Sequence, residues 1–144
     1  MVGPALWLDF SDKPADQPIT PTMLDAACAK VATTVEPGDI LLFRAWPGGH
    51  TDDGFMRCAG FNGAAAEWAV EKGIKALGCD LATPDDPGDM ARPVHVALLG
   101  RGILIMEHIM NLQTVPVRRF QFIGVPLRIK GATGSPIRAM AIIQ

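Results

Sequence analysis

Short apolar runs alternate with segments of helical periodicity as far as Met106, and this order constrains the fold more than any other feature. Four of the apolar runs are short and are bounded by turn-forming or polar residues, as buried strands are, at residues 5–10, 40–43, 74–79 and 103–106. Two more strand-like runs then follow one another, at residues 120–129 and 137–143. This order predicts an α/β fold with a mixed β-sheet and flanking helices.

Three segments between these runs are predicted to be helices. The first begins with Thr20 as N-cap and Pro21 at the first helical position, and its apolar residues recur at helical spacing: Leu24, Ala27, Cys28 and Val31. The second ends at Gly73 and has an apolar face of Ala64, Ala65, Trp68 and Ala69. The third runs from Pro93 to Leu99. The apolar face of the first helix is expected to pack on the sheet.

The composition indicates one domain, residues 1–144, and limits its partners. Hydrophobic residues make up 49% of the chain, which suits a folded domain with a real core. The formal charge of -2 and the scattered basic residues argue against nucleic-acid binding. No apolar run approaches the ~20 residues that a membrane span needs, so no membrane association is expected.

The three cysteines bear on the compartment. Cys28, Cys58 and Cys79 are odd in number, widely spaced and without a CxxC motif. This pattern favours reduced thiols over a disulfide framework. A cytoplasmic protein is therefore expected.

His95 and Glu107 are the candidate metal ligands. A hydrolytic metal site needs imidazole and carboxylate donors that converge on one ion, and a reversal at Gly100 and Gly102 can bring these two side chains together. A structural His is the alternative. His108 is expected to point away from the side of Glu107, because neighbours on a strand face opposite ways.

Other polar residues are assigned structural roles. His50, with Asp52 and Asp53, lies in a Gly-rich loop. Asp80 is interpreted as an acceptor for loop amides, and Asp85 as part of a simple turn before Pro87.

Several blocks in order resemble the metal-dependent cyclase family, the hydrolases that include kynurenine formamidase and isatin hydrolase. They are GPALWLDFS, EPGDILLFRA, NGAAAEWAVEKGIKALGCD, PVHVALL, GILIMEHIMNL and FIGVPLRIKGATGSPIRAMAII. The resemblance implies part of the swivelling β/β/α cyclase fold. It also implies that His95 and Glu107 bind a divalent metal, Zn or Mn, and that the substrate is a small amide or lactam such as N-formylkynurenine.

The family's remaining ligands and its catalytic His come from an upstream HxGTHxDxPxH motif, which this sequence does not contain. One hypothesis is a hydrolase that needs a separate polypeptide supplying that N-terminal half, so no catalytic residue is assigned within this chain. The alternative is a truncated, noncatalytic relative that acts as a folded binding or assembly module. Either reading predicts an uncovered apolar sheet edge, at residues 5–10 or at the C-terminal strands, and hence a homo-oligomer.

Overall fold

The computed structural model describes residues 1–143. Along the chain these residues form six strands, three α-helices and two short 3-10 helices. The elements are β1 (Val2–Asp9), α1 (Pro21–Lys30), β2 (Ile40–Arg44), η1 (Phe55–Arg57), α2 (Gly63–Glu71), β3 (Ala76–Cys79), α3 (Pro93–Leu99), β4 (Leu104–Met106), η2 (Leu112–Thr114), β5 (Arg119–Pro126) and β6 (Ile137–Ile142).

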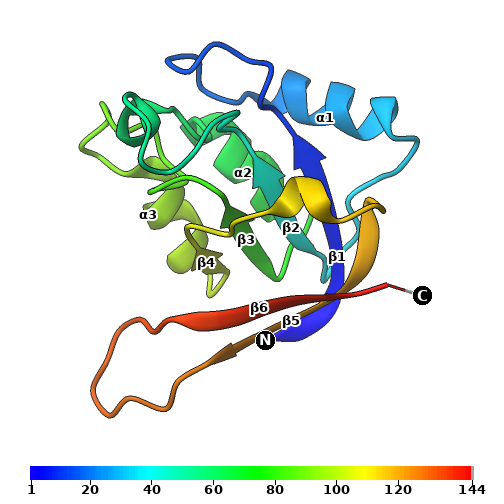
Figure 1. Cartoon of the computed structure of the whole chain (residues 1–144), viewed down its shortest axis with the longest axis vertical. Coiled ribbons are helices and arrows are strands. Elements are labelled where there is room, and N and C mark those ends of the chain that lie inside the picture. Colours follow the sequence, from blue (N-terminus) through cyan, green and yellow to red (C-terminus); the bar gives the residue numbers. More distant parts are fainter. Residues whose placement is uncertain (144) are drawn as a thin grey trace.

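The six strands form one sheet in the order β4-β3-β2-β1-β5-β6. Strands β1 to β4 are parallel, whereas β5 and β6 join antiparallel (Figure 1). The predicted mixed sheet is therefore confirmed. Because β1 to β4 step in one direction and crossovers between parallel strands are right-handed, α1, α2 and α3 all pack on the same face of the sheet.

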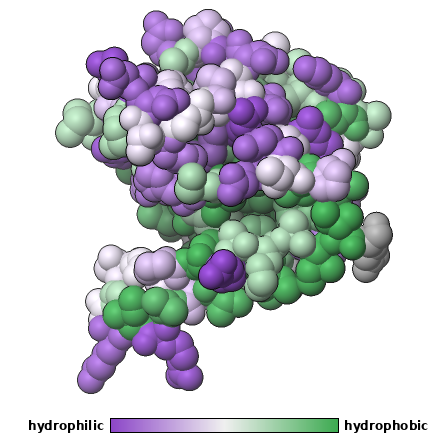
Figure 2. Space-filling view, viewed as in Figure 1, coloured by the Kyte–Doolittle hydropathy of each residue, from purple (hydrophilic) through white to green (hydrophobic). Residues whose placement is uncertain are grey.

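Of the two sheet edges expected from the sequence, the one at residues 5–10 was wrong and the one at the C-terminal strands is present. Strand β1 is paired on both sides, by β2 and by β5, so residues 5–10 are not an edge. The edges are β4 and β6. The hairpin formed by β5 and β6 carries a row of exposed apolar residues, and Figure 2 shows hydrophobic side chains gathered over this part of the molecule: Val125, Leu127, Ile129, Met140, Ile142 and Ile143.

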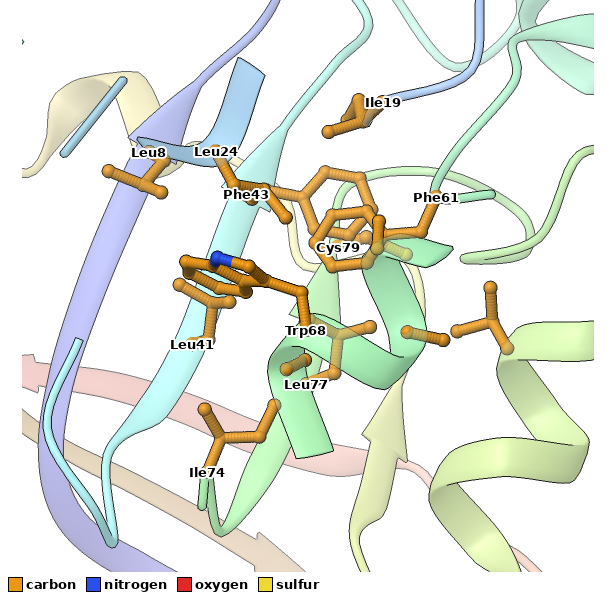
Figure 3. Close-up of a cluster of buried hydrophobic side chains, with 14 of the residues drawn as sticks. Leu8, Ile19, Leu24, Leu41, Phe43, Phe61, Trp68, Ile74, Leu77 and Cys79 are labelled. Atoms are coloured by element: carbon orange, nitrogen blue, oxygen red, sulfur yellow. The ribbon is translucent and has the colours of Figure 1, made fainter. Parts of the chain in front are cut away.

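The main core lies between the sheet and the three helices. Alternate residues of the central strands point into it, among them Leu41, Phe43 and Leu77, and Trp68 meets them from α2 (Figure 3). The rings of Phe43 and Phe61 stack with their centroids 4.7 Å apart. The predicted face of α1 packs on this core with Leu24 and Cys28 buried. The predicted face of α2 was partly wrong, because Ala64 is exposed and Ala66 is buried instead.

Among the described residues, the segment that covers the opposite face of the sheet contains no α-helix. Trp7, Ile40 and Leu42 point to this side of the sheet. They pack against Ile109, which precedes η2, and Leu112, which begins η2. The segment after β4 therefore folds back across the strands, as the yellow part of Figure 1 shows. Its path matters for the site, because it begins at Glu107.

Side-chain hydrogen bonds cap the first turn of two of the helices. Thr20 Oγ1 accepts from the backbone N–H of Met23, and Pro21 opens α1. Asn62 Oδ1 accepts from the N–H of Ala65 at 2.8 Å and caps α2. In α3 the N-cap position is Arg92, whose side chain makes no capping hydrogen bond.

The three cysteines are free and buried, as expected of reduced thiols. Burial raises the pKa of each thiol above its ordinary value. Over residues 1–143, none of the helices combines the length and apolar character of a membrane span.

Candidate metal centre

Polar residues collect at the carboxyl edge of the parallel strands, where open α/β sheets bind their ligands. Asp80 directly follows β3, and Glu107 directly follows β4. Helix α3 begins at this same edge, because it connects the end of β3 to the start of β4. His95 is the third residue of α3, so its side chain leaves the first helical turn beside these strand ends.

His95 and Glu107 face each other. His95 Nε2 lies 3.6 Å from Glu107 Oε1, and the two side chains are 32% and 36% exposed. Both line a hollow of about 630 Å³ that runs along β4 toward the β5–β6 hairpin, with Leu99 and Ser135 among its other walls. The fold brings the two candidate ligands together, and metal binding by them stays a prediction.

Asp85 holds the other side of the His95 ring. One carboxylate oxygen, Oδ2, lies 2.5 Å from His95 Nδ1, while Oδ1 accepts from the backbone N–H of Val94 at 2.7 Å. The Asp85 side chain is fully buried. Its carboxylate therefore links the start of α3 to the imidazole.

The interpretation of Asp85 as part of a simple turn was wrong. Asp86 makes the turn, since its side chain accepts from the N–H of Gly88. Asp85 is drawn inward because its segment pairs with the loop before α2, where Gly60 N–H donates to Asp85 O and Phe61 N–H donates to Pro84 O. That pairing joins segments far apart in sequence, so no local sequence pattern predicts it.

The donor pair suits a divalent metal. Imidazole nitrogen and carboxylate oxygen bind zinc at about 2.0–2.2 Å, so two donors of one tetrahedral ion lie about 3.4 Å apart. The separation of 3.6 Å between His95 Nε2 and Glu107 Oε1 is close to that value. Within residues 1–143 there is no group of three or more His, Cys, Asp or Glu side chains that could hold a metal ion.

The other two histidines form a separate cluster. His50 Nε2 lies 2.9 Å from the carbonyl oxygen of Asp80, and the His50 ring packs on Phe55. The ring of His108 lies beside these two rings, and His108 also lines the hollow beside His95 and Glu107. The expectation that His108 points away from the side of Glu107 was wrong, because β4 ends at Met106 and strand alternation does not apply to His108, whose φ is 55°. Asp52 accepts from the N–H of Gly49, which makes it part of the loop structure.

Asp80 has the structural role predicted for it. Its two carboxylate oxygens accept from the backbone N–H groups of Ala45, at 2.8 Å, and Trp46, at 3.1 Å. Desolvation by burial raises the pKa of Asp80 above its ordinary value, partly offset by these hydrogen bonds.

These observations define the class of protein: an α/β fold with a His–Glu donor pair at the carboxyl edge of a mixed sheet. Residues 1–86 match the family model described as "Putative cyclase", and the chain belongs to this family. It is 34% identical over 71 residues to a kynurenine formamidase of Salinibacter ruber, covering 49% of this chain and 33% of that protein. It is 35% identical over 75 residues to a kynurenine formamidase of Bacillus thuringiensis (strain Al Hakam), covering 52% and 35%.

Solved structures extend the likeness of the fold to the C-terminal part, which contains His95 and Glu107. Isatin hydrolase A from Ralstonia solanacearum has a TM-score of 0.88 at 24% identity, over 99% of this chain and 60% of that chain. A structure described as a novel cyclase has a TM-score of 0.82 at 25% identity, over 99% and 53%. This chain thus spans about a third of the two formamidases and somewhat more than half of these structures.

Proposed function

We propose that this chain supplies part of the metal site of a hydrolase that cleaves an amide or lactam C–N bond. The observation that carries the proposal is the pair His95 Nε2 and Glu107 Oε1, 3.6 Å apart on one hollow. Family membership supports hydrolysis, and the relatives named kynurenine formamidase and isatin hydrolase suggest an arylformamidase-like activity on a substrate such as N-formylkynurenine.

In this proposal His95 and Glu107 hold a divalent ion, Zn or Mn. When bound, such an ion polarises a carbonyl and lowers the pKa of water to about 7. His95 contributes a neutral nitrogen, and Glu107 contributes a negative charge that offsets part of the cation's charge. Leu99, Leu104 and Met106 line the same hollow, so its wall offers apolar contacts suited to the ring of an aromatic amide.

The remaining ligands come from elsewhere in this proposal. Catalytic zinc has typically three protein ligands, and residues 1–143 present two at this place. We infer that a polypeptide carrying the family's HxGTHxDxPxH motif supplies the other ligands and the His that transfers the proton. It would reach the hollow beside β4, the open side of the donor pair.

The alternative proposal is a noncatalytic module that folds and binds a partner. The exposed apolar residues of the β5–β6 hairpin, which offer a surface for a partner, support it. The two proposals differ in whether a hydrolytic site forms once the missing ligands are present.

The test compares the purified chain alone with the chain mixed with a polypeptide that contains the motif. Bound Zn and Mn are measured by elemental analysis, and hydrolysis of N-formylkynurenine by absorbance. Metal and turnover in the mixture alone support the split hydrolase, and neither in either sample supports the noncatalytic module. A fully active chain without the second polypeptide would contradict both.

Substitutions in the same mixture test the two ligands. His95→Ala and Glu107→Gln should each weaken metal binding more than about 100-fold, since even residues behind the ligands contribute 10- to 100-fold. Glu67→Gln is the matched control, because Glu67 lies on the exposed side of α2, pairs with Arg101, and is not among the residues that line the hollow. Unchanged metal binding in His95→Ala would remove His95 from the site.

We further propose that the chain self-associates through the β5–β6 hairpin, whose exposed apolar residues include Met140 and Ile142. Strand β6 is an open edge with unpaired backbone groups, which favours pairing with a second copy. Light scattering should show a species larger than the monomer, and Met140→Lys should shift it toward the monomer. A monomer at high concentration would contradict this. The free thiols also suit a cytoplasmic protein.

A further inference from the structure

We propose that Asp85 is a positioning residue that keeps the neutral His95 ring in the tautomer with its proton on Nδ1, leaving the lone pair on Nε2. The proposal rests on the proposed function in one respect only, namely that the atom bound by Nε2 is a metal ion. The tautomer itself depends on contacts within this chain.

The contacts of the His95 ring select this tautomer. A neutral imidazole has one N–H, and two carboxylates are near enough to compete for it. Asp85 Oδ2 lies at hydrogen-bond distance, 2.5 Å from Nδ1, whereas Glu107 Oε1 lies 3.6 Å from Nε2, beyond a hydrogen bond. The proton therefore belongs on Nδ1, and the lone pair of Nε2 is left on the side of the hollow.

Asp85 is held in place independently of His95. Pro93 has no N–H and the Arg92 side chain does not cap α3, so the first N–H of this helix is that of Val94, and Asp85 Oδ1 accepts it. The backbone of Asp85 is paired with Gly60 and Phe61. The carboxylate thus has one oxygen committed to the helix and one free to orient the ring.

An Asp85→Asn substitution separates positioning from mere packing. An amide has one acceptor and one donor end. Its oxygen is needed by the N–H of Val94, because the opposite orientation would place a donor against a donor. The NH₂ group then donates to His95 Nδ1, which must become the acceptor. The proton moves to Nε2, the atom that should carry the lone pair.

The experiment reads the tautomer directly in the purified, metal-free chain. The side-chain ¹⁵N chemical shifts of its three histidines are recorded at about pH 8.5, where an ordinary imidazole is neutral, and the His95 signals are assigned by their loss in His95→Ala. The wild type should show Nδ1–H, and Asp85→Asn should show Nε2–H. Asp86→Asn, a neighbouring substitution whose carboxylate contacts Gly88, should leave the wild-type signals unchanged.

Two results would overturn the proposal: Nε2–H in the wild type, or an unchanged tautomer in a folded Asp85→Asn. The wild-type measurement decides the matter even if the variant does not fold. A second readout adds Zn²⁺, in the presence of the motif-bearing polypeptide, and measures its affinity by calorimetry. Asp85→Asn should bind about 10- to 100-fold more weakly than the wild type. The expected tautomers with no zinc binding in any protein would retain Asp85 as a positioning residue and reject the metal site.

Discussion

Asp80 and Asp85 are two buried carboxylates in one loop, and they differ in what they hold. Asp80 accepts from two backbone N–H groups, those of Ala45 and Trp46. Asp85 accepts from one backbone N–H and contacts one imidazole nitrogen. A backbone N–H can only donate, whereas an imidazole nitrogen can donate or accept.

The difference shows that burial alone does not mark a functional carboxylate. Asp80 fixes the path of the loop after β2, and its hydrogen bonds end there. Asp85 transmits its position to a ring whose other nitrogen faces Glu107 and the hollow. A buried carboxylate becomes a candidate for function when one of its partners also reaches an open site.

Gly60→Ala should have the largest effect on stability, and it should disturb the surroundings of Asp85 and leave those of Asp80 unchanged. A Cβ at Gly60 would overlap the carbonyl group of Pro84, the residue before Asp85. We expect a loss of about 1–3 kcal/mol in the free energy of unfolding and a disturbed His95 signal. Urea unfolding and NMR measure the two effects. Gly134→Ala is the control, since nothing lies within 4 Å of its Cβ, and equal losses in both variants would contradict the prediction.

Asp80→Asn should lower the free energy of unfolding more than Asp85→Asn does. At residue 80 the amide NH₂ must face a backbone donor, which leaves buried groups unpaired at a cost of about 1–3 kcal/mol. At residue 85 the imidazole can become the acceptor, so the cost should remain below about 1 kcal/mol. Urea unfolding of both variants measures this. A larger loss in Asp85→Asn than in Asp80→Asn would break the comparison.

The smallest expected effect is the pH dependence that Asp80 gives to stability. Burial raises the pKa of Asp80 above its ordinary value of 3.8, so the folded protein binds this proton more tightly than the unfolded chain does. The contribution of Asp80 to stability is thus fully present below pH 3.8 and is lost as the pH rises through the raised pKa. Relative to Asp80→Asn, the wild type should gain stability as the pH falls from about 7 to about 4. Urea unfolding at several pH values checks this, and the opposite slope would contradict it.

Much of the fold could be predicted because its signals are local. Thr20 with Pro21 begins α1, and Pro93 begins α3, as the residues themselves indicate. The runs at residues 40–43 and 103–106 correspond closely to β2 and β4. The run at residues 120–129 was predicted too long, since β5 ends at Pro126 and Leu127 N–H donates instead to Ser135 Oγ.

The candidate site was only half predictable. His95 and Glu107 were identified by residue type and resemblance, whereas Asp85 looked like a turn residue. The sequence Asp85-Asp86-Pro87 in a polar loop does not indicate which of the two Asp side chains is buried. Pairing of its backbone with Gly60 and Phe61, more than twenty residues earlier, settles that choice.

The sequence by itself determined the order of strands and helices and the donor types at the site, because side-chain periodicity, turn chemistry and ligand chemistry are properties of neighbouring residues. Only the tertiary structure decided that β1 lies inside the sheet, that the segment after Glu107 covers its second face, and that Asp85 rather than Asp80 contacts His95. These outcomes depend on contacts between distant segments, where burial and hydrogen bonding are satisfied by the whole fold.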